Sequence, residues 1–188
     1  MPGMPPPSIH DFAGLATIAE YLRDARAAGG RKQVESGKLT EAEAADRLRV
    51  ATALAADWRR VADRTPRPEP IASQAELLAM LKGALPTAII RRDRAWKALI
   101  EGAPQYRRHK SAELWALSDQ IDAFSEEVRR DIREFVRPWL SAESVANGLA
   151  AMLWWQQRTG TESIHWLIDA TSALRSPAQT ADRGRLAA

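Results

Sequence analysis

The sequence predicts an all-α fold, namely a bundle of about six helices with an N-terminal αα-hairpin. Ala, Leu, Arg and Glu, which favour helices, dominate the 188 residues, and β-branched residues never cluster into a convincing strand. The chain is 45% hydrophobic and 27% charged, so it has enough apolar side chains to bury a core. Apolar residues recur by threes and fours, which is the spacing of one helix face.

A capping box gives the clearest local signal. Thr40 precedes Glu43 by three residues. The Thr40 hydroxyl can therefore accept from the Glu43 amide, while the Glu43 carboxylate can accept from the Thr40 amide. The helix that it opens has an apolar face and should end before Pro66, since a proline disfavours helix in the residue before it.

An earlier helix completes the predicted hairpin. It should begin near Asp11, and we expect Gly29-Gly30 to weaken or break it. Gly37 is a natural residue for its C-terminal end, because glycine adopts the left-handed conformation at little cost. Residues 9–65 would then form two helices joined by a short turn.

Prolines and termini suggest the remaining domain boundaries. Pro66, Pro68 and Pro70 alternate through a segment that cannot be helical, so residues 66–72 are the predicted linker. The helical bundle would then occupy 73–175. We expect residues 1–8 to be disordered and residues 176–188 to be a flexible tail.

Local signals also divide the bundle into helices. Ser73 and Glu76 form a second capping box. Pro86 is read as the start of a new helix, and Pro138 as the end of the strongest apolar repeat. The helices expected on this basis span 73–83, 86–102, 112–136, 141–158 and 162–175.

Composition excludes several classes of function. The chain has no cysteine, which rules out disulfides, thiolate zinc sites and cysteine nucleophiles. No apolar run approaches the roughly 20 residues that span a bilayer. The N-terminus lacks the basic start and apolar stretch of a signal peptide, so we expect a cytoplasmic protein. No cofactor is expected.

One segment carries a resemblance to known proteins. The matching residues are Arg31-Lys32-Gln33-Val34-Glu35-Ser36-Gly37-Lys38-Leu39-Thr40, Glu43-Ala44, Arg47-Leu48 and Ala55-Ala56-Asp57-Trp58-Arg59. This stretch, about residues 31–59, resembles a helical-hairpin segment of small uncharacterised proteins from phages and prophages of proteobacteria. The resemblance implies an accessory protein of a mobile element and transfers no functional residue. The chain departs from the pattern at Gly29-Gly30, which interrupts the first helix.

A basic cluster in the middle of the chain is the candidate nucleic-acid site. Arg91 and Arg94 should point away from the apolar face of their helix, with Lys97 on the flank of the same surface. Cations grouped in this way can contact phosphates, and an adjacent aromatic ring can stack on a base. The alternative is a solvated face that keeps a small domain soluble. The full candidate set is Arg91, Arg94, Lys97, Tyr106, Arg107, Arg108 and Lys110, with Tyr106 as the stacking residue.

Two tryptophans suggest a partner-binding patch. Of the seven tryptophans, Trp154 and Trp166 are the ones that fall off the apolar stripes of their predicted helices. Exposed tryptophans on consecutive helices are typical of a protein interface. The alternative is that the N-terminal hairpin covers both.

The histidines offer weaker candidates. His165 and Asp169 are spaced by one helical turn, as are His109 and Glu113, but no metal-binding motif supports a site, and no metal is expected. Arg158, followed by Thr159 and then by His165, resembles the degenerate Arg–His motif of the all-helical HEPN ribonucleases. That resemblance implies a metal-independent ribonuclease with Arg158 and His165 as its catalytic residues.

The function expected from these features is non-enzymatic. The chain would be a phage or prophage type interaction protein that binds a host protein or a nucleoprotein complex, for example as an inhibitor of a bacterial defence system. Two alternatives stay open, the HEPN-like ribonuclease and a structural phage component that forms a homo-oligomer. No membrane partner is expected.

Overall fold

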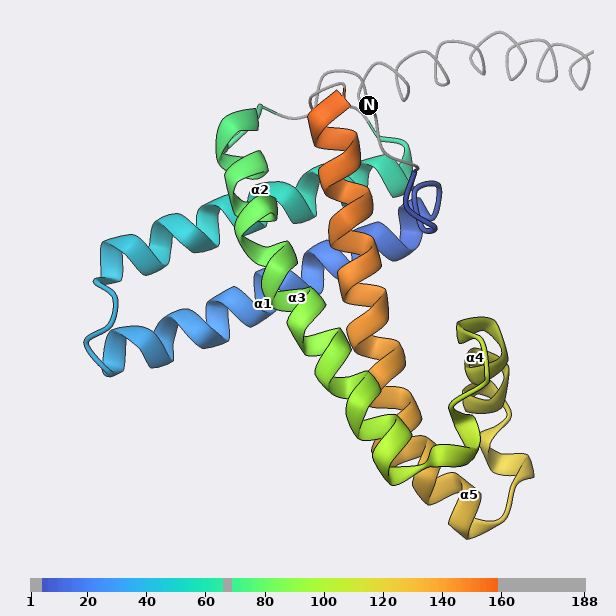
Figure 1. Ribbon diagram of the computed structural model, residues 1–188. Coiled ribbons are helices and arrows are strands. Elements are labelled where there is room, and N and C mark those ends of the chain that lie inside the picture. The colour runs from blue at the N-terminus through green and yellow to red at the C-terminus, as the bar shows by residue number, and fades with distance from the viewer. Residues whose placement is uncertain (1–4, 66–68, 159–188) are drawn as a thin grey trace, which may run out of the picture. The chain divides into compact units, whose positions relative to one another are not determined.

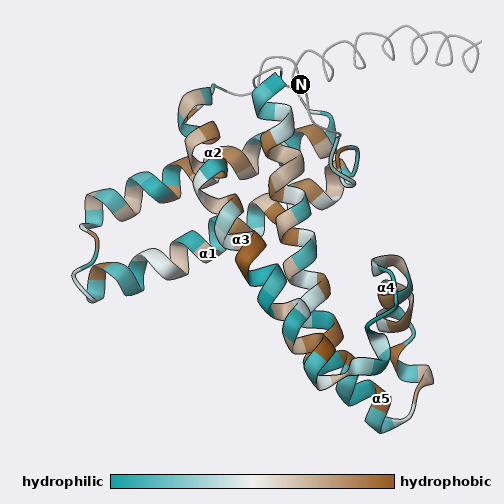
Figure 2. Ribbon diagram, viewed as in Figure 1, coloured by the Kyte–Doolittle hydropathy of each residue, from teal (hydrophilic) through white to brown (hydrophobic). Residues whose placement is uncertain are grey.

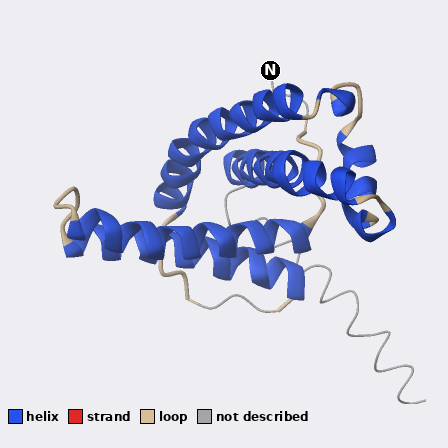
Figure 3. Cartoon of the chain, turned by 90° about the horizontal axis from the view of Figure 1, so that it is seen from below, coloured by secondary structure: helices blue, strands red, loops and turns tan. Residues whose placement is uncertain are grey.

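All regular elements in the described part of the chain are helical, which confirms the all-α class. The computed structural model describes residues 5–65 and 69–158 (Figure 1), and only helices, turns and loops occur within them (Figure 3). Five labelled α-helices stand where the sequence predicted about six: α1 (Phe12–Glu35), α2 (Glu41–Asp63), α3 (Gln74–Gly102), α4 (Ser111–Asp119) and α5 (Glu126–Asp131). Short 3₁₀ turns lie at Pro104–Tyr106 and Ile121–Ala123, and a π-helical turn, Ile132–Val136, joins α5 to helical residues 137–158.

The chain divides into two compact units. Among the described residues, unit 1 consists of 5–65, 69–81 and 151–158, and unit 2 consists of 82–150. Unit 1 therefore holds the α1–α2 hairpin and the first turns of α3, while unit 2 holds the rest of α3 with α4 and α5. Hydrophobic and hydrophilic residues alternate around the helices in both units (Figure 2), as expected for helices that bury one face.

The predicted hairpin is confirmed, and so are its capping residues. The Asp11 carboxylate accepts from the Gly14 amide at 2.9 Å, which caps α1. At the start of α2 the Thr40 amide donates to the Glu43 carboxylate at 2.8 Å, and the Glu43 amide donates to the Thr40 hydroxyl at 3.2 Å. Gly37 has φ of 70°, the left-handed conformation that ends α1.

Gly29-Gly30 does not break α1, contrary to the expectation. The helix runs continuously to Glu35. A glycine inside a helix costs about 1 kcal/mol relative to alanine, which a long helix with favourable neighbours can absorb.

The core of unit 1 forms where the base of the hairpin meets the start of α3 and the residues after 150. Its fully buried large side chains are Leu15, Leu54, Trp58, Leu77, Leu81 and Met152. An ion pair between Arg59 and Glu20, at 2.7 Å, connects α2 to α1 at the edge of this core. The Trp155 indole donates to the Ile9 carbonyl at 2.9 Å, so the segment before α1 also belongs to the unit.

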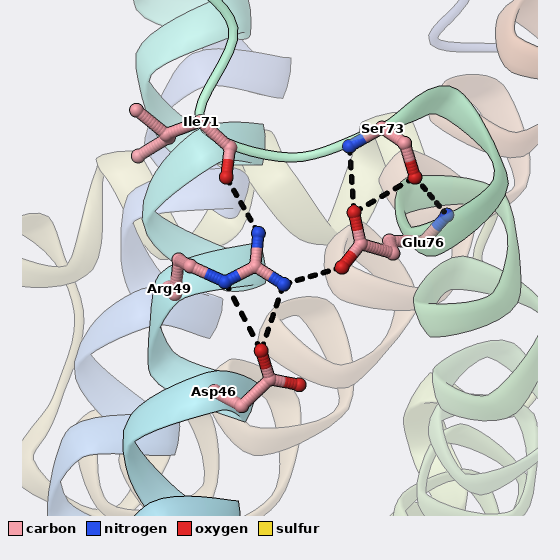
Figure 4. A network of polar contacts seen from close by, with 5 residues as sticks. All are labelled: Asp46, Arg49, Ile71, Ser73 and Glu76. Carbon is pink, nitrogen blue, oxygen red and sulfur yellow. Dashed lines mark hydrogen bonds and ion pairs between the residues drawn. The ribbon is translucent and has the colours of Figure 1, made fainter.

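A polar network attaches the start of α3 to α2 (Figure 4). Arg49 donates to the Ile71 carbonyl at 2.5 Å, to Asp46 at 2.7 Å and to Glu76. Glu76 also accepts from the Ser73 amide at 2.7 Å, which confirms the second predicted capping box. These hydrogen bonds lower the pKa of Glu76 from 4.5 to about 2, with the Ser73 amide as the largest cause and Arg49 next.

The predicted boundary at Gly83 and Pro86 is wrong. A single helix, α3, passes through both residues. Proline removes one backbone donor and strains the preceding turn, but it does not forbid a helix whose neighbouring turns are held by packing. The turns on either side bury Leu81 and Ala88, and this packing offsets the loss.

The predicted helix 112–136 is also wrong, because the chain forms two helices with an irregular connection there. α4 ends at Asp119, and Phe124 and Ser125 have extended backbones with ψ of 165° and 159°. Ser125 occupies the N-cap position of α5, and two glutamates follow it in the first turn, which favours a new helix start.

Pro138 and Ser141 do not separate two helices, contrary to the prediction. Helical residues continue through both to residue 158. The Arg137 amide donates to the Ile132 carbonyl five residues back, so the helix is already widened by one residue before the proline. A helix can accommodate a missing donor where its hydrogen-bond register has shifted in this way.

The unit 2 core explains why apolar residues keep a helical spacing across residues 120–125, although the backbone there is irregular. Apolar side chains on both sides of the irregular connection pack into one cluster. Its buried members are Leu99, Ala103, Tyr106, Leu114, Ile121, Ile132, Val136, Trp139 and Leu140.

Candidate nucleic-acid interface

The exposed face of α3 carries the first part of the candidate site. Arg91, Arg94 and Lys97 are all exposed, whereas Leu99 on the other side of the helix is fully buried. The Lys97 ammonium lies 3.7 Å from the Glu101 carboxylate. Because both side chains are exposed, this ion pair is weak and solvent screens it. Arg91 and Arg94 form no ion pair with any described residue, so their charges remain available to an anionic partner.

The second part of the candidate site follows α3. Arg107, Arg108 and Lys110 are exposed in the turn that leads to α4. The backbone amide of Lys110 donates to the Glu113 carboxylate at 2.9 Å, and this bond caps the start of α4. The Lys110 side-chain ammonium takes no part in it. We use the name basic surface for the set made of these three residues and of Arg91, Arg94 and Lys97 on α3.

Tyr106 does not fit the stacking role expected for it. Its side chain is only 6% exposed and belongs to the unit 2 core. Burial raises the pKa of its phenol, and Asp131 raises it further. The ring lies 5.6 Å from the His109 ring in an edge-on contact, so it supports the turn rather than facing solvent.

Charge is distributed unevenly within unit 2. Residues 82–112 hold eight lysines and arginines but only Asp93 and Glu101 as acids. Residues 113–150 hold four arginines and eight acids. The basic surface thus belongs to a segment with a marked excess of positive charge, although the whole chain has a net charge of only +3.

An open groove of about 480 Å³ borders this segment. It is lined by Arg92, Asp93, Trp96, His109, Lys110, Ser111, Trp139 and Glu143. The rings of Trp96 and Trp139 lie 5.1 Å apart at an angle of 52°. Trp139 is only 7% exposed and belongs to the unit 2 core, so half-buried Trp96 is the indole that is partly open to the groove. Lys110 belongs both to the groove and to the basic surface.

The polar residues of the groove are partly paired. Arg92 contacts Asp93 at 2.8 Å, and the Ser111 hydroxyl donates to Glu143 at 2.7 Å. His109 keeps its Nδ1 atom buried without a hydrogen-bond partner among the described residues. A groove lined by part of the Trp96 ring and by two cations can hold a planar or anionic group.

Sequence reasoning missed part of this groove. Arg92 was left out of the candidate set, although it precedes Trp96 by four residues and therefore shares its helix face. That spacing is the signal that could have identified it. Trp139 and Glu143 come from a helix far along the chain, and no local pattern brings them to Trp96.

The other candidates lie in or beyond the last described helix. Trp154 is half-buried, its ring 4.2 Å from the Arg158 guanidinium and 5.3 Å from the Trp155 ring. Arg158 itself is exposed. Thr159, His165, Trp166 and Asp169 lie outside the described residues, as do the predicted helix 162–175 and the tail.

Metal and membrane signals are absent from the described ranges. No cluster of three or more His, Asp or Glu side chains there is arranged to hold a metal ion. None of the helices in these ranges combines the length and the apolar character needed to cross a bilayer.

The comparisons with known proteins identify no relative. No protein-family model, no curated protein and no solved structure matches the chain.

Proposed function

We propose that this chain is a non-enzymatic interaction protein that binds nucleic acid, alone or within a nucleoprotein complex, through the basic surface of unit 2. The supporting observation is that Arg91, Arg94, Arg107, Arg108 and Lys110 are all exposed and form no ion pair with a described residue. Phosphates are the partners that such a group of unpaired cations attracts most strongly.

The groove beside Lys110 supports the same proposal. Half-buried Trp96 lies beside Arg92 and Lys110 in this groove, so part of an indole ring and two cations line one place. Unstacked bases bind to surfaces of this kind with little sequence preference. We therefore expect single strands to bind at least as well as duplexes of equal length.

The biological setting is part of the proposal and rests on the resemblance over residues 31–59. An accessory protein of a phage or prophage that contacts a nucleoprotein complex would act by occupying it, for example to inhibit a bacterial defence system. Trp154 would provide the protein contact in such a complex.

Fluorescence anisotropy with a labelled 20-nucleotide single strand and the matching duplex, a length of about two DNA turns, tests the proposal. We expect binding by the wild type and a loss of about tenfold or more in Arg91→Glu/Arg94→Glu. The matched control is Arg130→Glu/Arg133→Glu, since both arginines are exposed, lie in unit 2 and already pair with acids. Equal loss in the two double variants, or no binding by the wild type, would contradict the proposal.

A further inference from the structure

Trp115 is a large aromatic residue of unit 2 that the core does not use. It is 43% exposed, whereas Leu114 beside it in α4 is fully buried. Its indole makes no ring contact with another aromatic side chain in the described part of the chain. The surroundings of this indole therefore decide which partner it fits.

Small residues surround Trp115 on its own face of α4. Ser111 and Ala112 lie one helical turn before it, and Ser118 lies one turn after it. Ala112 is exposed and Ser118 is buried. Because side chains this short do not extend across an indole, the ring keeps part of its surface open to a planar group.

Cations lie near the start of α4, on one side of the indole. Ser111 lines the groove of unit 2 together with Arg92 and Lys110. It precedes Trp115 by four residues, which is about 6 Å along the helix axis. The edge of the groove, with its two cations, is thus about one helical turn from Trp115.

Another cation lies near the end of α4. The Arg137 guanidinium donates to the Ser118 hydroxyl at 3.1 Å and to the Ser118 carbonyl at 3.3 Å. Arg137 is exposed and forms no ion pair with any described residue. Its hydrogen bonds hold this charge beside a residue one turn from Trp115. Along α4 the indole therefore has positive charge on both sides.

The nearest acid on this face of α4 is on the other flank of the indole. Asp119 is exposed and follows Trp115 by four residues. It is rotated by about 100° from Ser118 around the helix axis. A phosphate is thus favoured on the flank of Ser111 and Ser118, where the cations lie, and a base attached to it can reach the ring.

We propose that Trp115 is the base-stacking residue of unit 2, and that it makes single-stranded nucleic acid the preferred partner over a duplex. An aromatic ring with cations on either side is the arrangement on which unstacked bases bind. Bases inside a duplex are stacked on each other and do not reach such a ring. This inference rests on the proposed function, and it gives Trp115 the role that buried Tyr106 does not fill.

Fluorescence anisotropy with the labelled single strand and its duplex tests the inference. Trp115→Ala should weaken single-strand binding about tenfold and leave duplex binding unchanged. Its salt slope should equal that of the wild type, since an indole releases no counterions. Trp115→Phe keeps a ring and should retain most of the affinity, whereas Trp115→Leu keeps only apolar bulk and should bind as weakly as Trp115→Ala.

Tyr21→Ala is the matched control, because Tyr21 is an aromatic residue with 52% exposure that belongs to unit 1. It should leave binding unchanged. Wild-type affinity of Trp115→Ala and Trp115→Leu for the single strand would overturn the inference, and so would an equal loss for strand and duplex. In both cases the wild type still binds, so the proposed function stands. A wild type that binds neither probe would overturn both.

Discussion

The Thr40 hydroxyl and the Glu43 carboxylate each satisfy an amide at the start of α2 that would otherwise lack an intrahelical partner. Thr40→Ala removes the acceptor for the Glu43 amide. We expect a loss of about 0.5–2 kcal/mol in the free energy of unfolding. Thermal melts followed by circular dichroism measure it, with Thr52→Ala as a control because Thr52 bonds only within the helix interior. A melting temperature identical to that of the wild type would show that the cap contributes nothing.

Glu76 should make the stability of unit 1 sensitive to acid. Its pKa is about 2 in the folded chain and 4.5 in the reference state. Because the folded pKa is the lower one, the stabilisation is complete above about pH 5 and disappears as the pH falls towards 2. Melting temperatures measured from pH 7 to pH 2 should fall in that window, and Glu76→Gln should reduce the slope. Identical pH profiles for both proteins would contradict the assignment.

Trp58 and Trp154 provide a matched pair of substitutions. Trp58 is 1% exposed, so Trp58→Ala should cost about 3–5 kcal/mol. Trp154 is half-buried and stacks with Arg158, a contact worth about 0.5–1 kcal/mol at exposed sites. Urea unfolding should therefore show a much smaller loss of unfolding free energy for Trp154→Ala than for Trp58→Ala. If Trp154 contacts a partner protein, its variant also loses that partner in a pull-down while staying folded. An equal cost for the two would place Trp154 in the core.

The starts of α2 and α3 were predictable from sequence because a capping box is a short-range pattern. Thr40 and Ser73 each bond to a residue three positions later, and both boxes are present. The helix ends within 73–158 were not predictable in the same way. Leu114, Ile121 and Ile132 share one core, so their spacing continues across a segment where Phe124 and Ser125 are extended. An apolar repeat reports which side chains are buried, not whether the backbone between them is helical.

Pro86 is a helix-breaking residue that nevertheless lies inside a continuous helix, α3, because the packing of the neighbouring turns stabilises the helix. Pro86→Ala would restore a donor to the Lys82 carbonyl, and we expect a gain of up to about 3 kcal/mol in stability. Pro104→Ala is the control, because Pro104 starts a 3₁₀ turn where its amide would have no helical partner. Chemical unfolding of both variants measures the difference. A destabilised Pro86→Ala would mean that the proline shapes α3 in a way that the rest of the chain requires.

Sequence reasoning located the charge of the candidate site better than its geometry. The excess of lysine and arginine in residues 82–112 is a property of composition, and Arg91, Arg94 and Lys97 are exposed as their helix periodicity predicts. Tyr106 was misjudged because its polar hydroxyl and basic neighbours do not reveal that its ring completes a core. The groove depends on Trp139 meeting Trp96, a contact between residues far apart in the chain. Such contacts follow from the fold and not from any local pattern.

The salt dependence of nucleic-acid binding tests the central claim most directly. Each phosphate contact releases counterions, so the logarithm of the binding constant should fall linearly with the logarithm of salt concentration. For Arg91→Glu/Arg94→Glu we predict that the slope falls by about one unit for each lost phosphate contact and that binding weakens alike for all sequences. Binding that is insensitive to salt, or a double variant that keeps the slope of the wild type, would contradict a role for the basic surface in contacting nucleic acid.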